Sequence, residues 1–409
     1  MKQKIDTFIM GILTLFSIYL YHLSASPISP TIEIKKTPLI QVVTEEKKAL
    51  NYLNELRQGA GLVPFKSQKE LKLAAKSHAD YLTNHLTYGH REEAKYSDFT
   101  GEYGSSRVMH YGYSAPQVIE NVSVNNKNYK ESIDGLFSAI YHRMAFLDFR
   151  VNTIGIGVSQ NLQHQEHTAF VYDMSSDALE KLYRSKKKIT NKNLDKALNC
   201  NKQNSSIILF PFNQQKNVPP AFFNELPDPL PTYDVSGYPI SISFNPQVYK
   251  NVKLLSFKIF ESDGNEVIDT IQYDFKSDPN QRLEKFDFVL FPLKRLKWNH
   301  HYVVKTLANV DNRLLEKRWE FYTQKFNLPF HRVTNQNEEF NIRERESHIF
   351  YFPPISKNDL LKDISYPSNF DIEFIDKNTI KLTAIEAIDK LQKLTIGDHS
   401  IVVKVVALK

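Results

Sequence analysis

The stretch YKESIDGLFSAIYHRMAFLDFRVNTIGIGVSQNLQHQEHTAFVYDM, residues 129–174, decides the fold of the first domain. Apolar residues recur at helical spacing over residues 129–147, which predicts a helix. Over residues 154–158, isoleucine and valine alternate with glycine, and this period of two predicts a strand. A second strand at residues 169–174 can pair with the first across the polar loop 160–167. A helix beside a short antiparallel hairpin predicts an α+β domain.

Two further helices are predicted upstream of this stretch. Thr44 is placed as the N-cap of the first helix, and Gly59 ends it. Ser67, with Glu70 three residues later, has the pattern of a capping box and starts the second helix. Together with the later helix and hairpin, these elements define an α+β domain over residues 44–185.

The sequence beyond this domain predicts two β-rich modules. Residues 186–206 are basic and polar and are interpreted as a solvated linker, with contact to an anionic wall polymer or membrane surface as the alternative. Several prolines follow, and then period-two runs joined by turn residues predict an immunoglobulin-like sandwich at residues 207–325. The same pattern predicts a small terminal β module at residues 326–409.

The N-terminus has the pattern of a secretory signal peptide. Two lysines precede an apolar run over residues 8–23, and the small residues 24–26 follow it. We therefore expect a signal peptide at residues 1–26 and a tether at residues 27–43. An uncleaved anchor is the alternative, because the apolar run approaches the ~17–25 residues that span a bilayer. The chain is expected to be secreted or held in the cell envelope, with membrane contact only through such an anchor.

The composition is that of a globular protein. The chain has 409 residues, of which 41% are hydrophobic and 24% charged, so disorder does not dominate. Cys200 is the one cysteine, which excludes an intramolecular disulfide. The net charge of +6 is spread over a long chain, and no basic stripe is interleaved with aromatic residues. Nucleic acid is therefore not an expected partner.

Three residues far apart in the sequence are candidates for one functional site: His90, Glu120 and His142. Two imidazoles and one carboxylate suit a divalent metal ion such as zinc, and the same groups could act as acid and base. The alternative is that they only hydrogen-bond one another and tie a loop to a helix. Glu92 follows His90 closely and is either a fourth member of the site or an exposed loop carboxylate.

Other ionisable residues are assigned to structure rather than to chemistry. His78 lies on an apolar helical face and is expected to be a core histidine. His164, Glu166 and His167 fall in the hairpin loop and are expected to be solvated. The sequence has no Gly-x-Ser-x-Gly and no His-Glu-x-x-His motif, so no catalytic residue is assigned.

Residues 49–174 resemble the CAP superfamily of cysteine-rich secretory, antigen-5 and pathogenesis-related proteins, in its bacterial SCP-like branch. The similarity rests on short pieces in a shared order: Leu53-Asn54-Glu55-Leu56-Arg57, Ala74-Ala75, His78-Ala79, Gly89-His90-Arg91-Glu92, Phe99-Thr100-Gly101, Arg107, Gly112-Tyr113, Glu120-Asn121, Tyr141-His142-Arg143 and Ile154-Gly155-Ile156-Gly157-Val158. The proline-rich region around residues 218–240 is similar to the connector that joins bacterial CAP domains to an immunoglobulin-like module.

The resemblance implies an α–β–α sandwich with a surface cavity lined by histidines and acidic residues. In the family pattern His90 matches the first histidine, Glu120 the glutamate of a Gly-Glu-Asn motif, and His142 the histidine of a His-Arg motif. This implies a non-enzymatic binding module for a lipid, peptide or glycan of the envelope. A metal-dependent hydrolase and an adhesion protein that uses its β modules are the alternatives. The sequence names neither the ligand nor the oligomeric state.

Overall fold

The computed structural model describes residues 39–185, 188–199 and 201–407. They form two compact units: one contains the described residues from 39 to 327 together with residues 353–360, and the other contains residues 328–352 and 361–407. The predicted signal peptide, most of the predicted tether and Cys200 lie outside the described residues. Among the described helices, none combines the length and the apolar character needed to cross a bilayer.

A four-stranded sheet forms the middle layer of the first unit's α+β domain. Its strand order is β1-β3-β4-β2, and β4 pairs antiparallel with both β3 and the edge strand β2. The predicted hairpin is confirmed as β3 and β4. The strands are β1 (Lys66–Ser67), β2 (Ile119–Val124), β3 (Thr153–Gln160) and β4 (Thr168–Ser175).

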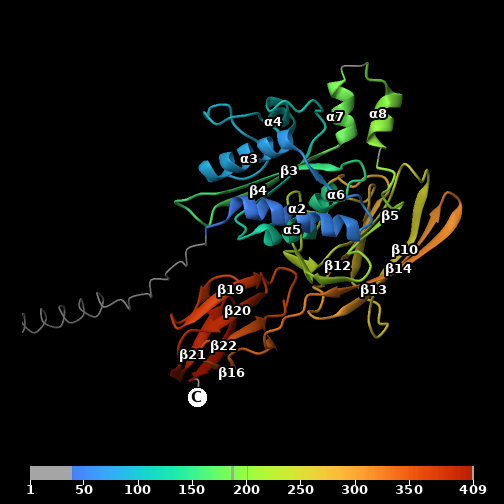
Figure 1. Ribbon diagram of the computed structural model, residues 1–409. Helices are drawn as coiled ribbons and strands as arrows, with labels where there is room; N and C mark the ends of the chain where they lie inside the picture. Colours follow the sequence, from blue (N-terminus) through green and yellow to red (C-terminus); the bar gives the residue numbers. More distant parts are fainter. Residues whose placement is uncertain (1–38, 186–187, 200, 408–409) are drawn as a thin grey trace, which may run out of the picture. The chain divides into compact units, whose positions relative to one another are not determined.

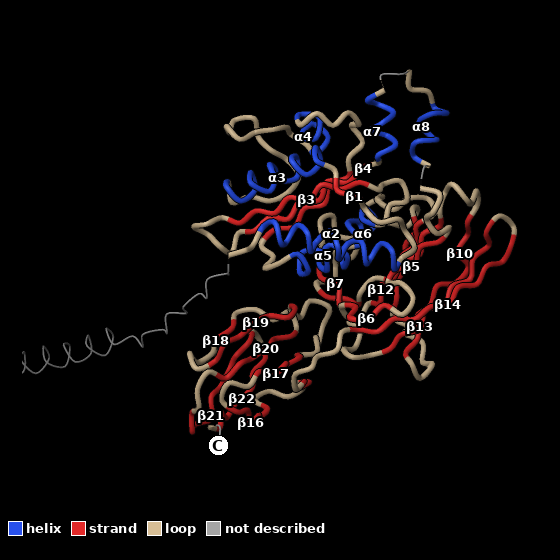
Figure 2. The backbone as a smooth tube through the Cα atoms, in the orientation of Figure 1, coloured by secondary structure: helices blue, strands red, loops and turns tan. Residues whose placement is uncertain are grey.

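Helices cover both faces of this sheet, which gives the expected α–β–α sandwich (Figure 1). The helices α3 and α4 cover one face, and α2, α5 and α6 cover the other (Figure 2). The helices are α2 (Val42–Gly59), α3 (Lys69–Asn84), α4 (Gly104–His110), α5 (Tyr129–Ser138), α6 (Ile140–Phe146), α7 (Asp177–Arg184) and α8 (Asn191–Leu198).

The helix boundaries correct several sequence predictions. The helix expected over residues 129–147 is two helices, because Ala139 between them has an extended backbone (φ −74°, ψ 113°). Gln41 occupies the N-cap position of α2 in place of Thr44, and Gln68 that of α3 in place of Ser67. The segment expected to be a solvated linker contains α8, whose N-cap Thr190 forms a capping box.

A β-sandwich follows in the same compact unit. One sheet has the order β10-β13-β14-β6 and the other β11-β12-β9-β5, with a separate β7-β8 pair. The strands are β5 (Ile207–Phe210), β6 (Gln215–Val218), β7 (Ala221–Phe223), β8 (Val235–Gly237), β9 (Ile240–Phe244), β10 (Val252–Glu261), β11 (Thr270–Asp274), β12 (Asp287–Pro292), β13 (His301–Val310) and β14 (Arg313–Thr323). Its immunoglobulin-like character stays a prediction.

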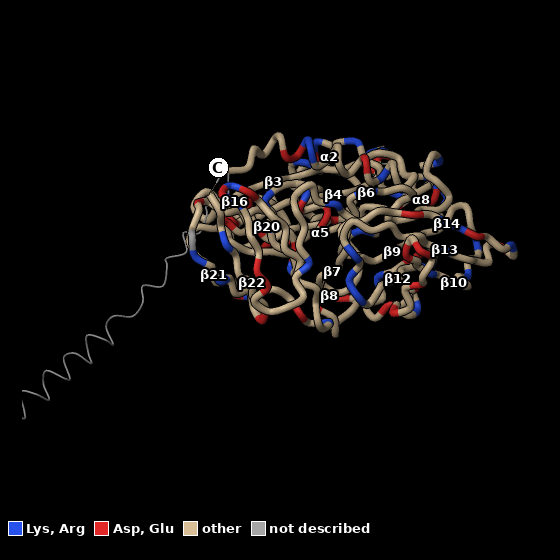
Figure 3. Tube along the Cα trace, turned by 90° about the horizontal axis from the view of Figure 1, so that it is seen from below, with Lys and Arg blue, Asp and Glu red and all other residues tan. Residues whose placement is uncertain are grey.

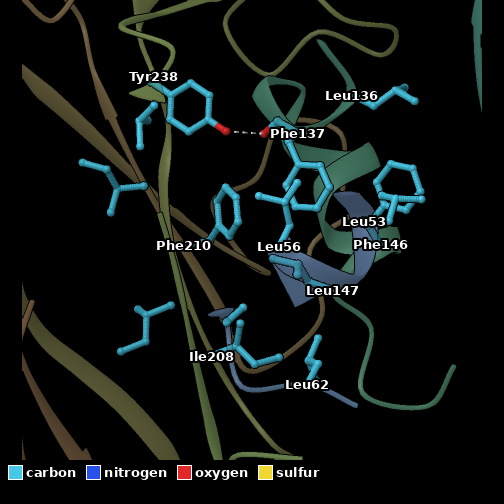
Figure 4. Close-up of a cluster of buried hydrophobic side chains, with 14 of the residues drawn as sticks. Leu53, Leu56, Leu62, Leu136, Phe137, Phe146, Leu147, Ile208, Phe210 and Tyr238 are labelled. Atoms are coloured by element: carbon cyan, nitrogen blue, oxygen red, sulfur yellow. Dashed lines mark hydrogen bonds between the residues drawn. The ribbon is translucent and has the colours of Figure 1, made fainter. Parts of the chain in front are cut away.

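The α+β domain and the sandwich share one hydrophobic core, because Phe137 and Phe146 of the helical layer pack with Phe210 of the sandwich (Figure 4). Arg143 of α6 is fully buried at this contact, where its guanidinium donates to the carbonyl oxygens of Phe137 (2.6 Å) and Pro239 (2.7 Å). The two modules are therefore packed as one body.

The second unit is a smaller all-β module with its own core. Its sheets have the orders β15-β17-β20-β19 and β16-β22-β21-β18, and both contribute to one apolar cluster. The strands are β15 (Phe330–Arg332), β16 (Glu338–Arg343), β17 (Ser347–Tyr351), β18 (Ile364–Ser365), β19 (Phe370–Asp376), β20 (Thr379–Ala384), β21 (Ile388–Ile396) and β22 (His399–Val406).

Charged residues of both signs are interspersed along the described chain (Figure 3). Ion pairs between them are frequent, for example Lys72 with Glu46 (2.6 Å) and Lys297 with Glu261 (2.6 Å). Most charged side chains thus lie near charges of the opposite sign, and the net charge of +6 is not gathered in one place.

Candidate functional site

Glu120 lies on the edge strand β2, on the face of the sheet that α3 covers. The strand register aligns Glu120 with Asp173 of β4, and Asp173 with Gly155 of β3. Gly155 marks the face, because a Cβ at this glycine would overlap the backbone carbon of Leu71 in α3. Residues aligned across neighbouring strands share a face. Glu120 and Asp173 therefore face the α3 layer together.

His90 lies in the loop after α3 and is hydrogen-bonded to Glu120. Its Nδ1 is 2.9 Å from Oε1 of Glu120. The His90 side chain is 50% exposed, whereas that of Glu120 is only 7% exposed. The pair thus places an accessible imidazole over a buried carboxylate. Of the predicted site residues His90, Glu120 and His142, the structure brings His90 and Glu120 together.

Arg107 of α4 is the cation beneath this pair. Its side chain is fully buried and donates to Oε2 of Glu120 and to the carbonyl oxygen of His90 (3.1 Å). A second carboxylate, Glu92, lies 3.7 Å from its Nε atom. A buried guanidinium is stable only when paired and hydrogen-bonded, so Arg107 holds both carboxylates in place.

Glu92 belongs to this buried network and is not an exposed loop residue. Its carboxylate is hydrogen-bonded to Nδ1 of His78 (3.0 Å) and accepts from the amide of Thr100 (2.8 Å). The other ring nitrogen of His78 lies 3.0 Å from the carbonyl oxygen of Gly89. His78 is fully buried, so it is the core histidine that its helical position predicted. It fixes the start of the loop that carries His90.

The carboxyl groups of Glu120 and Asp173, which lie opposite each other across the strands, have pKa shifts in opposite directions. Burial would raise the pKa of Glu120, but the hydrogen bond with His90 and the charge of Arg107 lower it to about 2. Burial and the negative charge of Glu120 raise the pKa of Asp173 well above its usual value. Within the described residues no donor reaches either carboxylate oxygen of Asp173. Glu120 is therefore ionised, and Asp173 is held in its neutral form.

The ionised Glu120 also fixes the proton on the imidazole. A carboxylate only accepts hydrogen bonds, so Nδ1 of His90 carries the proton when the ring is neutral. In the part of the chain that the structure describes, Nε2 of His90 has no hydrogen-bond partner. This nitrogen is the atom of the site that can accept a hydrogen bond from a ligand.

His142 lies on α6, in the helical layer over the opposite face of the sheet. Asn121, the neighbour of Glu120 on β2, points to that face and donates from Nδ2 to the carbonyl oxygen of His142 (2.9 Å). The ring of His142 is hydrogen-bonded through Nδ1 to Glu225, at 3.1 Å. His142 is thus paired with a carboxylate of the segment before β8 and does not join His90 and Glu120.

The metal site expected from His90, His142 and Glu120 is not formed in this arrangement. Glu120 and His142 lie on opposite faces of the sheet. Among the described residues, no group of three His, Cys, Asp or Glu side chains is placed to hold a metal ion. A single imidazole and a carboxylate already engaged by Arg107 leave too few ligands for zinc. His164 and Glu166 remain exposed in the hairpin loop, as expected.

Sequence reasoning did not assign Arg107, Asp173 or Glu225 to the site. A charged residue within the apolar strand Ala169-Phe170-Val171-Tyr172-Asp173-Met174 is a signal that could have identified Asp173. Arg107 is one of the pieces that resemble the family pattern, but no local pattern indicates the partner of Arg107 or of Glu225, because these partners are 13 and 83 residues away in the chain.

Comparison with known proteins gives one family match. Residues 50–174 match the model of CAP, the cysteine-rich secretory protein family. No curated relative matched the sequence.

Three solved structures of CAP- or SCP-type proteins each match about a third of the chain. An outer surface protein from Borrelia burgdorferi has 18% identity and a TM-score of 0.29, and the match covers 33% of this chain and 94% of that one. An extracellular SCP-domain protein from Bacillus anthracis has 13% identity and a TM-score of 0.29, over 33% and 44% of the two chains. Schistosoma mansoni venom allergen-like protein 4 has 13% identity and a TM-score of 0.24, over 34% and 89%.

Proposed function

Because residues 50–174 form a CAP domain, we propose that this chain is an exported binding protein whose ligand hydrogen-bonds to His90. The observation that supports this function is the geometry of one pair: an imidazole that is half exposed rests on the buried, ionised carboxylate of Glu120. The pair is oriented before any ligand arrives, and preorganisation lowers the cost of binding.

The chemistry around His90 favours a peptide or glycan over the apolar part of a lipid. Nε2 of His90 can accept a hydrogen bond from a hydroxyl or an amide N–H. The nearby chain exposes Tyr103, and the guanidinium of Arg91 lies 5.6 Å from the centre of its ring. Aromatic and charged groups next to one hydrogen-bond acceptor suit a polar ligand with some flat apolar surface.

Binding is better supported than hydrolysis. A carboxylate that orients a histidine is half of the arrangement that activates a nucleophile. Among the described residues, no serine, threonine or cysteine side chain is hydrogen-bonded to the ring of His90. The site therefore has a base and its orienting group, without a partner to activate.

The location outside the cytoplasm is part of the same proposal. It is supported by the two lysines, the apolar run and the small residues that begin the sequence. A role at the envelope, either secreted or anchored, follows from this pattern.

The test is ligand capture by the purified chain. Wild-type protein is incubated with an envelope extract, washed and analysed by native mass spectrometry beside His90→Ala and Glu120→Gln. We expect a bound species in the wild type that is lost in both variants. His164→Ala, which removes an exposed loop histidine, serves as the matched control and should keep the ligand. Equal capture by His90→Ala would reject the proposal.

A further inference from the structure

A groove of about 900 Å³, which we call the sandwich groove, lies on the β-sandwich, and His90 is not part of its lining. This volume is in the range of about 300–1,000 Å³ that is usual for ligand sites. Its wall comes from segments within residues 214–217, 299–301 and 322–327, together with Lys130 of α5. The three segments lie at the neighbouring strands β6, β13 and β14 of one compact unit (Figure 2).

Two stacked rings form one side of the sandwich groove. His301 of β13 and Tyr322 of β14 lie directly opposite each other, and their ring centres are 4.6 Å apart with 13° between the ring planes. Buried residues precede and follow Tyr322 in β14, so its side chain points away from the core. Nε2 of His301 lies 3.0 Å from Oε2 of Glu320, which fixes the imidazole. The rings therefore present an ordered, flat surface to a ligand.

A β-bulge lies next to these rings. Two residues of β6, Lys216 and Asn217, lie opposite the single residue Tyr322 of β14, because the register shifts between the flanking pairs. Bulges of this kind re-aim side chains out of the regular alternation. Both residues are exposed, whereas the first and last residues of β6 are buried. The bulge thus presents a lysine and an amide together beside the aromatic pair.

The lining of the sandwich groove contains three lysines and no carboxylate. Lys130 is paired with Asp134 of its own helix. Lys216 and Lys325 are exposed, and within the described residues their side chains form no ion pair or hydrogen bond. The lining therefore has two positive charges without a partner.

Two acids contact the histidines of the wall, and neither cancels this surplus. Glu320, which contacts His301, also lies 3.9 Å from Arg318. Glu261 lies 3.5 Å from Nε2 of His300 and is paired with Lys297 at 2.6 Å. Each acid thus has a cation of its own outside the lining, and the charges of the two unpaired lysines remain.

Side-chain amides supply the rest of the polar lining: Gln214, Asn217, Asn299, Gln324 and Asn327. The amide of Gln214 donates to Glu320. The other four side chains form no hydrogen bond in the part of the chain that the structure describes. An amide offers both donors and an acceptor, which matches hydroxyl groups that also donate and accept.

We infer that the sandwich groove binds an acidic glycan, with Lys216 and Lys325 pairing with its negative groups and Tyr322 packing against a sugar ring. A sugar ring has a C–H face for the aromatic pair and hydroxyl groups for the amides. An acidic peptide would satisfy the two lysines but would leave most of these other groups unused. The negative group is a carboxylate or a sulfate ester, since a lysine pairs with either as a point charge.

The experiment measures binding to the full chain by isothermal titration calorimetry. The acidic probes are tetragalacturonic acid, which carries carboxylates, and sucrose octasulfate, which carries sulfate esters. Maltotetraose is the neutral sugar, and acetyl-tetraglutamate amide carries the carboxylates without sugar rings. We expect one acidic sugar to bind about tenfold more tightly than both of these controls, with an affinity that falls as salt is added. Which acidic sugar binds identifies the negative group.

Matched variants locate the binding. Lys216→Gln/Lys325→Gln removes the two unpaired charges and should weaken binding of the acidic sugar about tenfold. Tyr322→Ala removes the outward ring and should also weaken it. Lys250→Gln/Lys253→Gln changes two exposed lysines of the sandwich outside the groove and should bind like the wild type.

Three results would overturn the inference: no binding of either acidic sugar, equally tight binding of the glutamate peptide, or unchanged binding in either groove variant. The sandwich groove shares no residue with the His90–Glu120 pair, so His90→Ala should bind the acidic sugar like the wild type. The two sites can therefore fail separately.

Discussion

Nδ1 of His142 lies 3.1 Å from Oε2 of Glu225, and this hydrogen bond joins α6 of the CAP domain to the segment between β7 and β8. The same carboxylate accepts from the amides of Ile140 (2.6 Å) and Tyr141 (3.3 Å). Glu225 therefore caps the N-terminus of α6 from a distance of 85 residues in the chain. This contact accounts for the break between α5 and α6, because the amides at the start of a helix need acceptors.

Glu225→Ala is expected to destabilise the first compact unit by about 2–4 kcal/mol, because hydrogen bonds to charged groups contribute roughly 1.5–3 kcal/mol and three donors lose their acceptor. Glu225→Gln should cost less, since its carbonyl oxygen can still accept one amide. Denaturation by urea, followed by circular dichroism, measures the change. Glu316→Ala, at an exposed glutamate of β14, should stay within about 0.5 kcal/mol of the wild type.

The low pKa of Glu120 predicts that the folded chain loses stability at acid pH. Its folded pKa of about 2 lies below the ordinary value of 4.5, so its contribution is complete above pH 4.5 and is lost as the pH falls towards 2. We expect Glu120→Gln to lower the free energy of unfolding by about 3 kcal/mol at pH 7, with a smaller difference at pH 3. A difference that does not change between these two pH values would contradict the ionised state of Glu120.

The raised pKa of Asp173 predicts the opposite pH dependence of the free energy of unfolding. Its folded pKa is raised, so the folded chain holds a proton that the unfolded chain has released, and stability falls as the pH rises above about 4. Asp173→Asn keeps the shape of the neutral acid and removes this cost. The variant should be more stable than the wild type at pH 7, and the gain should shrink towards pH 4. Urea unfolding at both pH values gives the comparison.

The terminal module should lose stability as the pH falls below about 6.5, the ordinary histidine pKa. His331 and His348 are hydrogen-bonded at 2.8 Å, and burial together with the charge of His348 lowers the pKa of His331. A lowered histidine pKa means that the unfolded chain takes up the proton first, so acid favours unfolding. Hydrogen exchange at the amides of β15 and β17, divided by the intrinsic chemical exchange rate at the same pH, measures this effect. We expect this ratio to be higher at pH 5.5 than at pH 7.

His331→Phe is the control for this pH effect. Phenylalanine can keep the packing against Phe340 and Phe350, whose rings both lie 4.9 Å from that of His331, but it does not titrate. The excess exchange at pH 5.5 should therefore disappear in this variant. If it persists, the proton is taken up elsewhere in the module.

Gly157 is required for the contact between β3 and α3. A Cβ at this position would overlap the backbone of Ala75, so Gly157→Ala must push the helix away from the sheet. We expect a loss of roughly 3 kcal/mol, since overpacking against backbone cannot be relieved by a side-chain rotation. Gly135→Ala in α5 has no atom within 4 Å of its new Cβ and should be neutral or stabilising. Urea unfolding of the two variants beside the wild type measures both effects.

The sequence predicts the α+β fold and the hairpin because their signals are local. The alternation at Ile154, Ile156 and Val158 is read directly from neighbouring residues, and the structure gives β3 at Thr153–Gln160. Helix ends are predicted less well. Ser67 has the pattern of an N-cap, but it pairs with Ile154 in the sheet, so tertiary pairing outweighs the local preference.

The candidate site was predictable only in part. The loop after α3 and the strand β2, which carry His90 and Glu120, belong to one domain. The sequence resembles the family pattern of this domain, and the pair was predicted from that resemblance. The position of His142 depends on Glu225, which lies in the next module and acts through a contact that no local pattern encodes. Asp173 is neutral because it is fully buried and because the charged Glu120 is its neighbour across the strands.

The burial of Arg143 between the two modules also has a consequence for the order of folding. Its guanidinium donates to Pro239, which leaves the ribosome almost a hundred residues later, so the helical layer cannot complete its buried hydrogen bonds while it is being synthesised. An arginine left in an unfinished core carries a desolvation cost that favours the open chain. For a chain proposed to be exported, we expect such a delay to favour an open N-terminal half during translocation, with closure once the sandwich has crossed.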